Sequence, residues 1–178
     1  MGSMMQIDID FDFVDQFGCP QIAIFVDDQL LYSGNVLEHV CVIASVGPGE
    51  HQLEIVHSDK KINDYNETCD RHVLIKKVRF NGVDLDQLEH CPLTHRGKFY
   101  PAYEASYLET CKEQDTELPE YISPNHYLGH NGTWILQFSA PVYDWIISEQ
   151  KPSGINLEDT IFSTGQDSLS EIKKFFNV

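Results

Sequence analysis

The first part of the chain alternates apolar and polar residues without a break. In residues 5–13 every second side chain is apolar, and the positions between them carry Gln6, Asp8, Asp10 and Asp12. A period of two is typical of a strand with one face on a core and the other in water. Six further segments are rich in β-branched and aromatic residues and are also predicted to be strands: residues 22–26, 30–32, 40–44, 51–56, 73–80 and 134–138.

Short turn signals separate these segments. Asp27 and Asp28 follow one predicted strand directly and precede another, which predicts a hairpin. The Gly-Pro-Gly-Glu run at residues 47–50 and the Asn-Gly pair at 81–82 are strong turn sequences of the same kind. Short strands at this spacing, with little helical periodicity before residue 90, predict an all-β fold of the β-sandwich or jelly-roll type.

The second half of the chain is less regular. Prolines divide a long irregular excursion at about residues 93–125, which is expected to be a binding loop or a segment that wraps the core. The apolar run at 142–147 follows Pro141 and is predicted to be a paired strand. Ser168 and Glu171 form a capping box for a short C-terminal helix. Together these patterns predict a single sandwich domain over residues 5–150, followed by a tail at 151–178 that carries the short helix.

Net charge narrows the classes of partner. Twenty-eight acidic residues against twelve lysines and arginines give a net charge of -16, which repels phosphate backbones and anionic lipid. Nucleic acid and membranes are therefore not expected as partners. The surplus of carboxylates either holds a hard cation or only keeps the protein in solution. The sequence contains no signal-peptide pattern and no apolar stretch of membrane-spanning length, so a soluble chain is expected, with no prediction of its location.

The strong enzyme signatures are absent from the sequence. It contains no nucleophile elbow, phosphate-binding loop, dinucleotide-binding turn or zinc-protease helix, so we predict no catalytic residues and no enzymatic activity. Five widely spread cysteines suggest neither a disulfide framework nor a zinc ribbon. A carboxylate pair for glycoside cleavage is a spatial feature that a sequence does not reveal.

Three motifs stand out in residues 20–85: Pro-x-Ile-x-Ile-x-Val-Asp-Asp at residues 20–28, Gly-x-His-x-Leu-x-Ile at 49–55, and Asp70-Arg71 entering an apolar strand that ends in Asn81-Gly82. On these three motifs, the segment resembles the small calcium-dependent carbohydrate-binding modules of the xylan-binding type, which are jelly-roll β-sandwiches. The resemblance implies the same fold and a sugar ligand. It also implies a calcium ion held by carboxylates of the loop between the second and third motifs.

By position, the two calcium-binding aspartates of these modules fall at Asp59 and Asp70, and Asp64 and Glu67 lie between them. These four acids are the predicted metal ligands, because calcium takes six to eight oxygens from carboxylates, carbonyls and water. Ser58 replaces the asparagine that the family keeps before its first aspartate. The alternative is that Arg71 pairs with a carboxylate or loop carbonyls and only holds the strand entrance.

The expected ligand contacts are Tyr65, Arg71, Trp134 and Trp145, although strand aromatics more often belong to the core. The sequence thus predicts a non-catalytic β-sandwich binding module, with calcium-assisted carbohydrate recognition as the leading hypothesis. The alternative is a structural or assembly protein, for example a bacteriophage virion component, that uses the sandwich as a scaffold and buries the excursion against protein partners. A homo-oligomer is compatible with either hypothesis.

Overall fold

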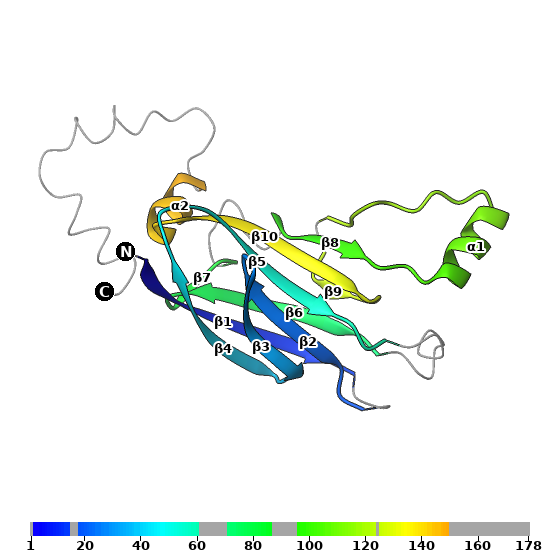
Figure 1. The fold of residues 1–178 in the computed structure, drawn as a ribbon, viewed down its shortest axis with the longest axis horizontal. Coiled ribbons are helices and arrows are strands. Elements are labelled where there is room, and N and C mark those ends of the chain that lie inside the picture. Colours follow the sequence, from blue (N-terminus) through cyan, green and yellow to red (C-terminus); the bar gives the residue numbers. More distant parts are fainter. Residues whose placement is uncertain (1, 15–17, 61–70, 87–95, 124, 150–178) are drawn as a thin grey trace, which may run out of the picture.

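Two antiparallel sheets face each other in a computed structural model of the chain, which describes residues 2–14, 18–60, 71–86, 96–123 and 125–149 (Figure 1). Sheet A has the order β4-β1-β6-β7, with β9 also paired to β6. Its strands are β1 (Ser3–Phe13), β4 (His39–Val46), β6 (Val73–Phe80), β7 (Val83–Asp84) and β9 (Tyr127–Leu128). The predicted all-β sandwich is confirmed.

Sheet B has the order β3-β2-β5-β10-β8. Its strands are β2 (Gln21–Val26), β3 (Gln29–Asn35), β5 (Gly49–His57), β8 (Lys98–Pro101) and β10 (Gly132–Ala140). The hairpin predicted at Asp27 and Asp28 is confirmed as the β2–β3 connection, and Asp27 takes a positive φ of 52° there. The strands predicted on either side of residues 47–50 also exist, but they lie in opposite sheets, so this turn crosses from sheet A to sheet B.

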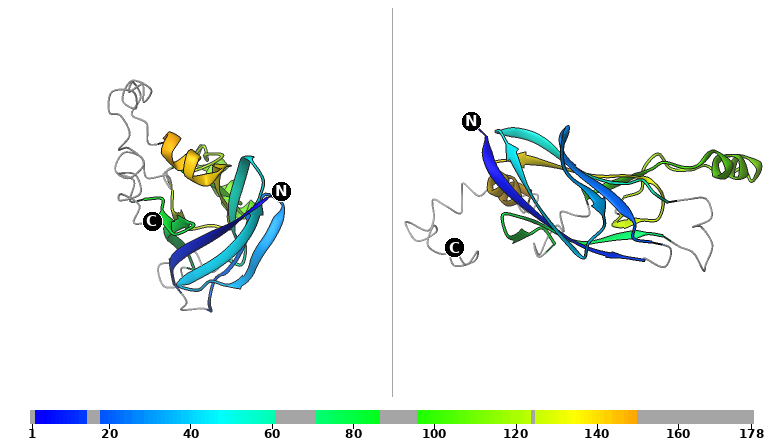
Figure 2. Two further views of the ribbon diagram at one scale, coloured as in Figure 1. Left: turned by 90° about the vertical axis from the view of Figure 1, so that its left-hand side faces the viewer. Right: turned by 60° about the horizontal axis from the view of Figure 1, so that its bottom comes forward.

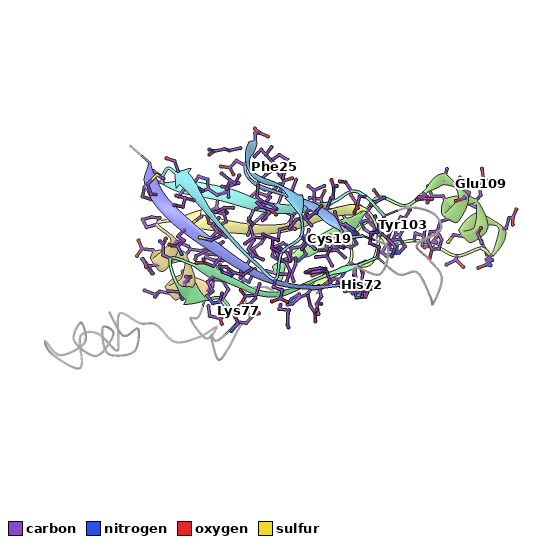
Figure 3. All side chains as sticks on the ribbon, turned by 90° about the horizontal axis from the view of Figure 1, so that it is seen from below. Cys19, Phe25, His72, Lys77, Tyr103 and Glu109 are labelled. Atoms are coloured by element: carbon purple, nitrogen blue, oxygen red, sulfur yellow. The ribbon has the colours of Figure 1, made fainter. Side chains whose placement is uncertain are left out.

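The core lies between the sheets because the strands bury every second residue. Ile7 and Ile9 of β1 and Leu53 and Ile55 of β5 are all fully buried, which is the pattern that the alternation at residues 5–13 predicts. The side chains at the intervening positions form the two outer faces. Figure 3 shows these faces on opposite sides of the molecule, with Phe25 projecting from sheet B and Lys77 from sheet A.

The prediction of a strand at residues 142–147 is wrong. The segment belongs to the helix α2 (Val142–Glu149), which packs beside β10 at one end of the sandwich (Figure 1). Val142, Trp145 and Ile146 are its buried residues, and this spacing of three and four positions fits one face of a helix. The apolar run at 142–147 fits both the period of a strand and the period of a helix. The positions of its buried side chains in the structure are those of a helix.

The irregular excursion forms an arm that leaves the sandwich after β8 and returns before β9. It carries the helix α1 (Ala105–Glu113), which lies beyond the end of the two sheets in Figures 1 and 2. The base of the arm is closed by a backbone bridge between Phe99 and Ile122. Tyr103 stacks on Tyr107 of α1, with ring centroids 5.7 Å apart. No helix in the described ranges is long and apolar enough to cross a membrane, and the predicted C-terminal helix lies outside those ranges.

Candidate functional site

Asp59 lies at the end of β5, where a calcium ligand was expected. Its Oδ1 accepts a hydrogen bond of 2.9 Å from the backbone N–H of Gln21, and its Oδ2 accepts one of 2.9 Å from Nη1 of Arg71. The Asp59 side chain is only 22% exposed. Arg71 and the backbone of β2 thus satisfy both carboxylate oxygens within the protein, as in the alternative in which Arg71 serves as a structural partner.

A buried histidine lies next to Asp59. His57 is fully buried, its Nδ1 donates to the carbonyl of His130 over 3.1 Å, and its Nε2 faces Asp59 Oδ1 at 3.4 Å. Burial lowers the pKa of His57, which favours the neutral imidazole. Neighbouring Lys60 is fixed to Asn131 by two backbone–amide hydrogen bonds of 2.8 Å. The cluster therefore ties the end of β5 to the start of β10.

These contacts do not favour Asp59 as a calcium ligand, because a cation would have to compete with a guanidinium group for the same oxygens. The other predicted metal ligands, Asp64, Glu67 and Asp70, lie outside the described residues, as does Tyr65. Across the described parts of the chain, no group of three His, Cys, Asp or Glu side chains is arranged to hold a metal ion.

The two tryptophans predicted as ligand contacts lie in the core. Trp134 is fully buried, and its indole N–H donates to the carbonyl of Asn125 over 2.9 Å. Trp145 is 6% exposed and packs near the rings of Phe80 and Phe138. Neither indole presents a face to solvent on which a sugar could stack.

The outer face of sheet B brings together a different set of polar residues. In the pairing of β5 with β10, Gln52 stands opposite Gln137, and Glu54 stands opposite Ile135. Lys98 of β8 lies on the other side of Ile135. Because side chains opposite each other in a sheet share a face, these five residues form one contiguous surface.

A hollow of about 280 Å³ opens on this surface beside β8, and we call it the β8 hollow. It is lined by Gln52, Arg96, Lys98, Tyr100, Ile135 and Gln137. Between the lining residues Arg96 and Lys98, Gly97 lies directly on the buried Trp134: a Cβ at Gly97 would come within 2.2 Å of the indole ring. Only glycine allows the chain to pass so close to the tryptophan.

An aromatic corner borders the β8 hollow. The ring of Tyr100 lies 5.6 Å from that of Tyr121, centroid to centroid, and Tyr121 is 41% exposed. Lys98 Nζ lies 4.5 Å from the centroid of the Tyr121 ring, a cation–π contact. The corner thus combines an accessible aromatic face with a positive charge.

A second hollow, of about 320 Å³, continues the first toward the β2–β3 hairpin, and we call it the hairpin hollow. It shares Gln52 and Gln137 with the β8 hollow and adds Asp27, Glu50 and His51. His51 Nδ1 lies 2.9 Å from Asp27 Oδ2, and its Nε2 lies 2.8 Å from the carbonyl of Gly47. Asp27 raises the pKa of His51, since both ring nitrogens face acceptors and the imidazolium form can donate to both.

The sequence did not single out the lining of either hollow. Its residues come from β5, β8, β10 and the hairpin, and they adjoin only through strand pairing. The amides at 52 and 137 fall at outward positions of two predicted strands, which is a usable signal, but the sequence does not say which strands pair.

The outer face of sheet A carries an exposed cysteine and a histidine beside acidic side chains. On sheet A, Cys41 is exposed, but Asp8 beside it raises the pKa of the thiol and so disfavours the nucleophilic thiolate. His39 lies between two aspartates, with Nδ1 2.8 Å from Asp10 Oδ1 and Nε2 3.6 Å from Asp8 Oδ1. These contacts link β4 to β1 through polar side chains.

No protein-family model matches the sequence, and no curated protein matches it. Among solved structures, the chain is similar to vCBM60, from a study of circular permutation between two families of calcium-dependent carbohydrate-binding modules. The TM-score is 0.46 at 11% identity, over 74% of this chain and 89% of that one. A second structure, vCBM60 in complex with galactobiose, gives a TM-score of 0.45 at 8% identity, over 77% and 98% of the two chains. Both TM-scores lie below 0.5 at 11% identity or less, so neither structure assigns a role to this chain.

Proposed function

We propose that the protein is a non-catalytic carbohydrate-binding module whose glycan lies on the outer face of sheet B, in the β8 hollow and the hairpin hollow. The observation that carries this proposal is the lining of the β8 hollow, where two opposed amides stand beside a tyrosine and an exposed aromatic corner.

This combination suits a sugar for a chemical reason. A pyranose has a ring face made of C–H groups and an edge of hydroxyls, each of which both donates and accepts a hydrogen bond. The rings of Tyr100 and Tyr121 offer an apolar surface to the face. Gln52 and Gln137 each carry a donor and an acceptor for neighbouring hydroxyls. An open site with a few fixed polar groups also matches the general pattern of ligand pockets.

The side chains of this site are held in place by the sheet, which is a further argument for ligand binding there. Gln52 Nε2 donates to Glu54 Oε1 over 2.8 Å, which holds the amide on the sheet surface and leaves its carbonyl oxygen for a ligand. The strands on which these residues lie are paired over nine positions, from Gly49–Ala140 to His57–Gly132. A site on paired strands loses less freedom on binding than a site on a loop.

Calcium assistance is a separate part of the proposal, and the sequence resemblance alone supports it. Asp70, with Asp64 and Glu67, carries that expectation, whereas Asp59 is already paired with Arg71. Thermal melts with calcium and with chelator test it, since an ion that binds the native state raises its stability. Calcium should raise the Tm of the parent and not that of Asp70→Ala. An unchanged Tm in the parent would remove calcium from the account.

The main experiment is a binding screen by affinity electrophoresis and calorimetry. The glycans are xylan, galactan, glucomannan and acidic plant and algal polysaccharides. The proteins are the parent, Gln137→Ala and Tyr121→Ala, with Gln29→Ala and Tyr143→Ala as matched controls at exposed positions outside both hollows. We expect at least one glycan to bind the parent. Its affinity should fall about fivefold or more in Gln137→Ala and Tyr121→Ala and stay unchanged in the two controls. Binding to none, or equal binding by all variants, contradicts the proposal.

A second candidate function is the structural or assembly protein, and one observation favours it. The α1 arm (residues 102–121) extends from the sandwich, and Tyr107 and Leu108 on α1 are 43% and 37% exposed. Exposed apolar side chains on a projecting element suit a protein contact. Light scattering on the parent and Leu108→Asp, with Leu37→Asp as the exposed control, tests it. A self-association that only Leu108→Asp removes would favour assembly through the arm, and a monomer at all concentrations would count against self-assembly.

A further inference from the structure

Charge is unevenly distributed between the two hollows on sheet B. Among the described residues, the lining of the β8 hollow contains Arg96 and Lys98 and no carboxylate, although the whole chain carries 28 acids and 12 lysines and arginines. The hairpin hollow contains Asp27 and Glu50. The outer face of sheet B therefore has a basic end at β8 and an acidic end at the hairpin.

The two basic side chains of the β8 hollow differ in the groups that they contact. Arg96 forms an ion pair with Glu149 of α2, so its charge is already compensated. Other basic side chains on the strands behave in the same way: Lys76, Lys77 and Arg79 each pair with an aspartate of sheet A. Lys98 is exposed, and its ammonium group lies over the ring of Tyr121. Within the described ranges its positive charge meets an aromatic ring and no carboxylate.

The nearest acid in the same row of the sheet is too far away to neutralise Lys98. Lys98 pairs with Ile135, which pairs with Glu54, so the two charged residues lie two strands apart, or roughly 10 Å at strand spacing. Glu54 also accepts a hydrogen bond from Gln52. The apolar side chain of Ile135 separates them, which leaves Lys98 facing the hollow.

We propose that the β8 hollow selects an acidic sugar, a uronic acid whose carboxylate contacts Lys98 while its ring lies on the Tyr100–Tyr121 corner and its hydroxyls reach Gln52 and Gln137. This inference rests on the proposed function and names its substrate class. An ammonium group pairs well with a carboxylate, and the cation–π contact with Tyr121 holds the Lys98 ammonium group at the aromatic corner. The net charge of -16 opposes polyanions at long range, but salt screens that repulsion more than it weakens a contact pair.

The test compares each acidic glycan with its own neutral form. Polygalacturonate, glucuronoxylan and alginate are measured beside the same polymers after chemical reduction of their carboxyl groups, at about 0.15 M salt, where the Debye length is about 8 Å. The parent should bind at least one acidic form about fivefold more tightly than its reduced form. Lys98→Gln should remove that preference, Lys98→Arg should retain it, and Lys112→Gln on α1 should leave it unchanged.

The outcomes separate the two proposals. Equal binding of acidic and reduced glycans, or a preference that survives in Lys98→Gln, overturns the acidic-sugar inference and leaves carbohydrate binding intact. No binding to any glycan in either form overturns both. A melting curve of Lys98→Gln that matches the parent shows that lost preference does not reflect unfolding, since the side chain is exposed and buries little area.

Discussion

His51 Nδ1 lies 2.9 Å from Asp27 Oδ2, and this contact ties strand β5 to the β2–β3 hairpin. The other ring nitrogen faces the carbonyl of Gly47, so both contacts are complete only when the ring is protonated. The same aspartate accepts from the backbone N–H of Gln52 over 3.0 Å, next to the amide that both hollows share. The geometry of the hairpin hollow therefore depends on the charge of one histidine.

The raised pKa of His51 predicts how stability changes with pH. A raised folded-state pKa adds stability that is fully present below the unfolded value of 6.5 and is lost as pH rises through the folded pKa. We expect His51→Gln to cost about 1 kcal/mol below pH 6 and less as the solution becomes alkaline. Urea denaturation from pH 5 to pH 9 measures this cost in the free energy of unfolding. Asp27→Asn should remove the same pH-dependent contribution to that free energy. A cost that does not vary with pH would contradict the account.

The lowered pKa of Asp10, on the outer face of sheet A, predicts that stability depends on pH in the direction opposite to that of His51. Arg79 and His39 lower the pKa of Asp10 to about 2, so its contribution is present above the unfolded value of 3.8 and is lost as pH falls toward 2. Asp10→Asn should cost about 1 kcal/mol at neutral pH, because solvent screening limits a pair at the surface. The cost should vanish in acid denaturation between about pH 4 and pH 2. Asp12→Asn, at a more exposed pair, is the control and should have a smaller effect.

Gly97 predicts a steric effect beneath the β8 hollow. Its added Cβ would lie 2.2 Å from the fully buried ring of Trp134, which has no room to shift. Gly97→Ala should therefore cost about 2–3 kcal/mol. Gly47→Ala is the matched control, because a Cβ there meets nothing within 4 Å. Equal melting temperatures for the two variants would show that the chain does not press on Trp134.

Substitution of Trp145 tests whether its indole ring is part of the core. It lies 6.1 Å from Phe80 and from Phe138, ring to ring, so Trp145→Ala should cost about 3 kcal/mol or more. Tyr143, two residues earlier on the solvent side of α2 and 48% exposed, should tolerate alanine within about 0.5 kcal/mol. A Trp145→Ala variant as stable as the parent would place the indole outside the core.

The fold was predictable from the sequence where one face of a strand is buried. The alternation in β1 and the hairpin at Asp27 follow from local rules of periodicity and turn chemistry. The helix α2 was not predictable in the same way, because a short apolar run fits both a strand and a helix until its neighbours are known. The crossing of residues 47–50 between sheets likewise depends on tertiary packing.

The candidate site was predictable only in part. Asp59 was predicted to bind calcium, and Arg71 to contact a ligand or to pair with a carboxylate or loop carbonyls. The structure pairs Arg71 with Asp59, a partner that the sequence did not identify. Gln52 and Gln137 are ordinary polar residues 85 positions apart, and only the register of β5 against β10 makes them neighbours. Tyr100, Tyr121 and Lys98 lie in the irregular excursion, where no periodicity marks which side chains face outward.

The central claim is that a glycan binds on the outer face of sheet B, and a backbone amide NMR titration tests it most directly. The parent is titrated with short oligosaccharides of each glycan in the screen. The account predicts that at least one of them shifts the amides of Gln52, Lys98, Tyr100 and Gln137, while those of Asp59, Arg71 and strand β4 stay unchanged. Shifts confined to Asp59 and Arg71, or no shift with any oligosaccharide, would contradict it.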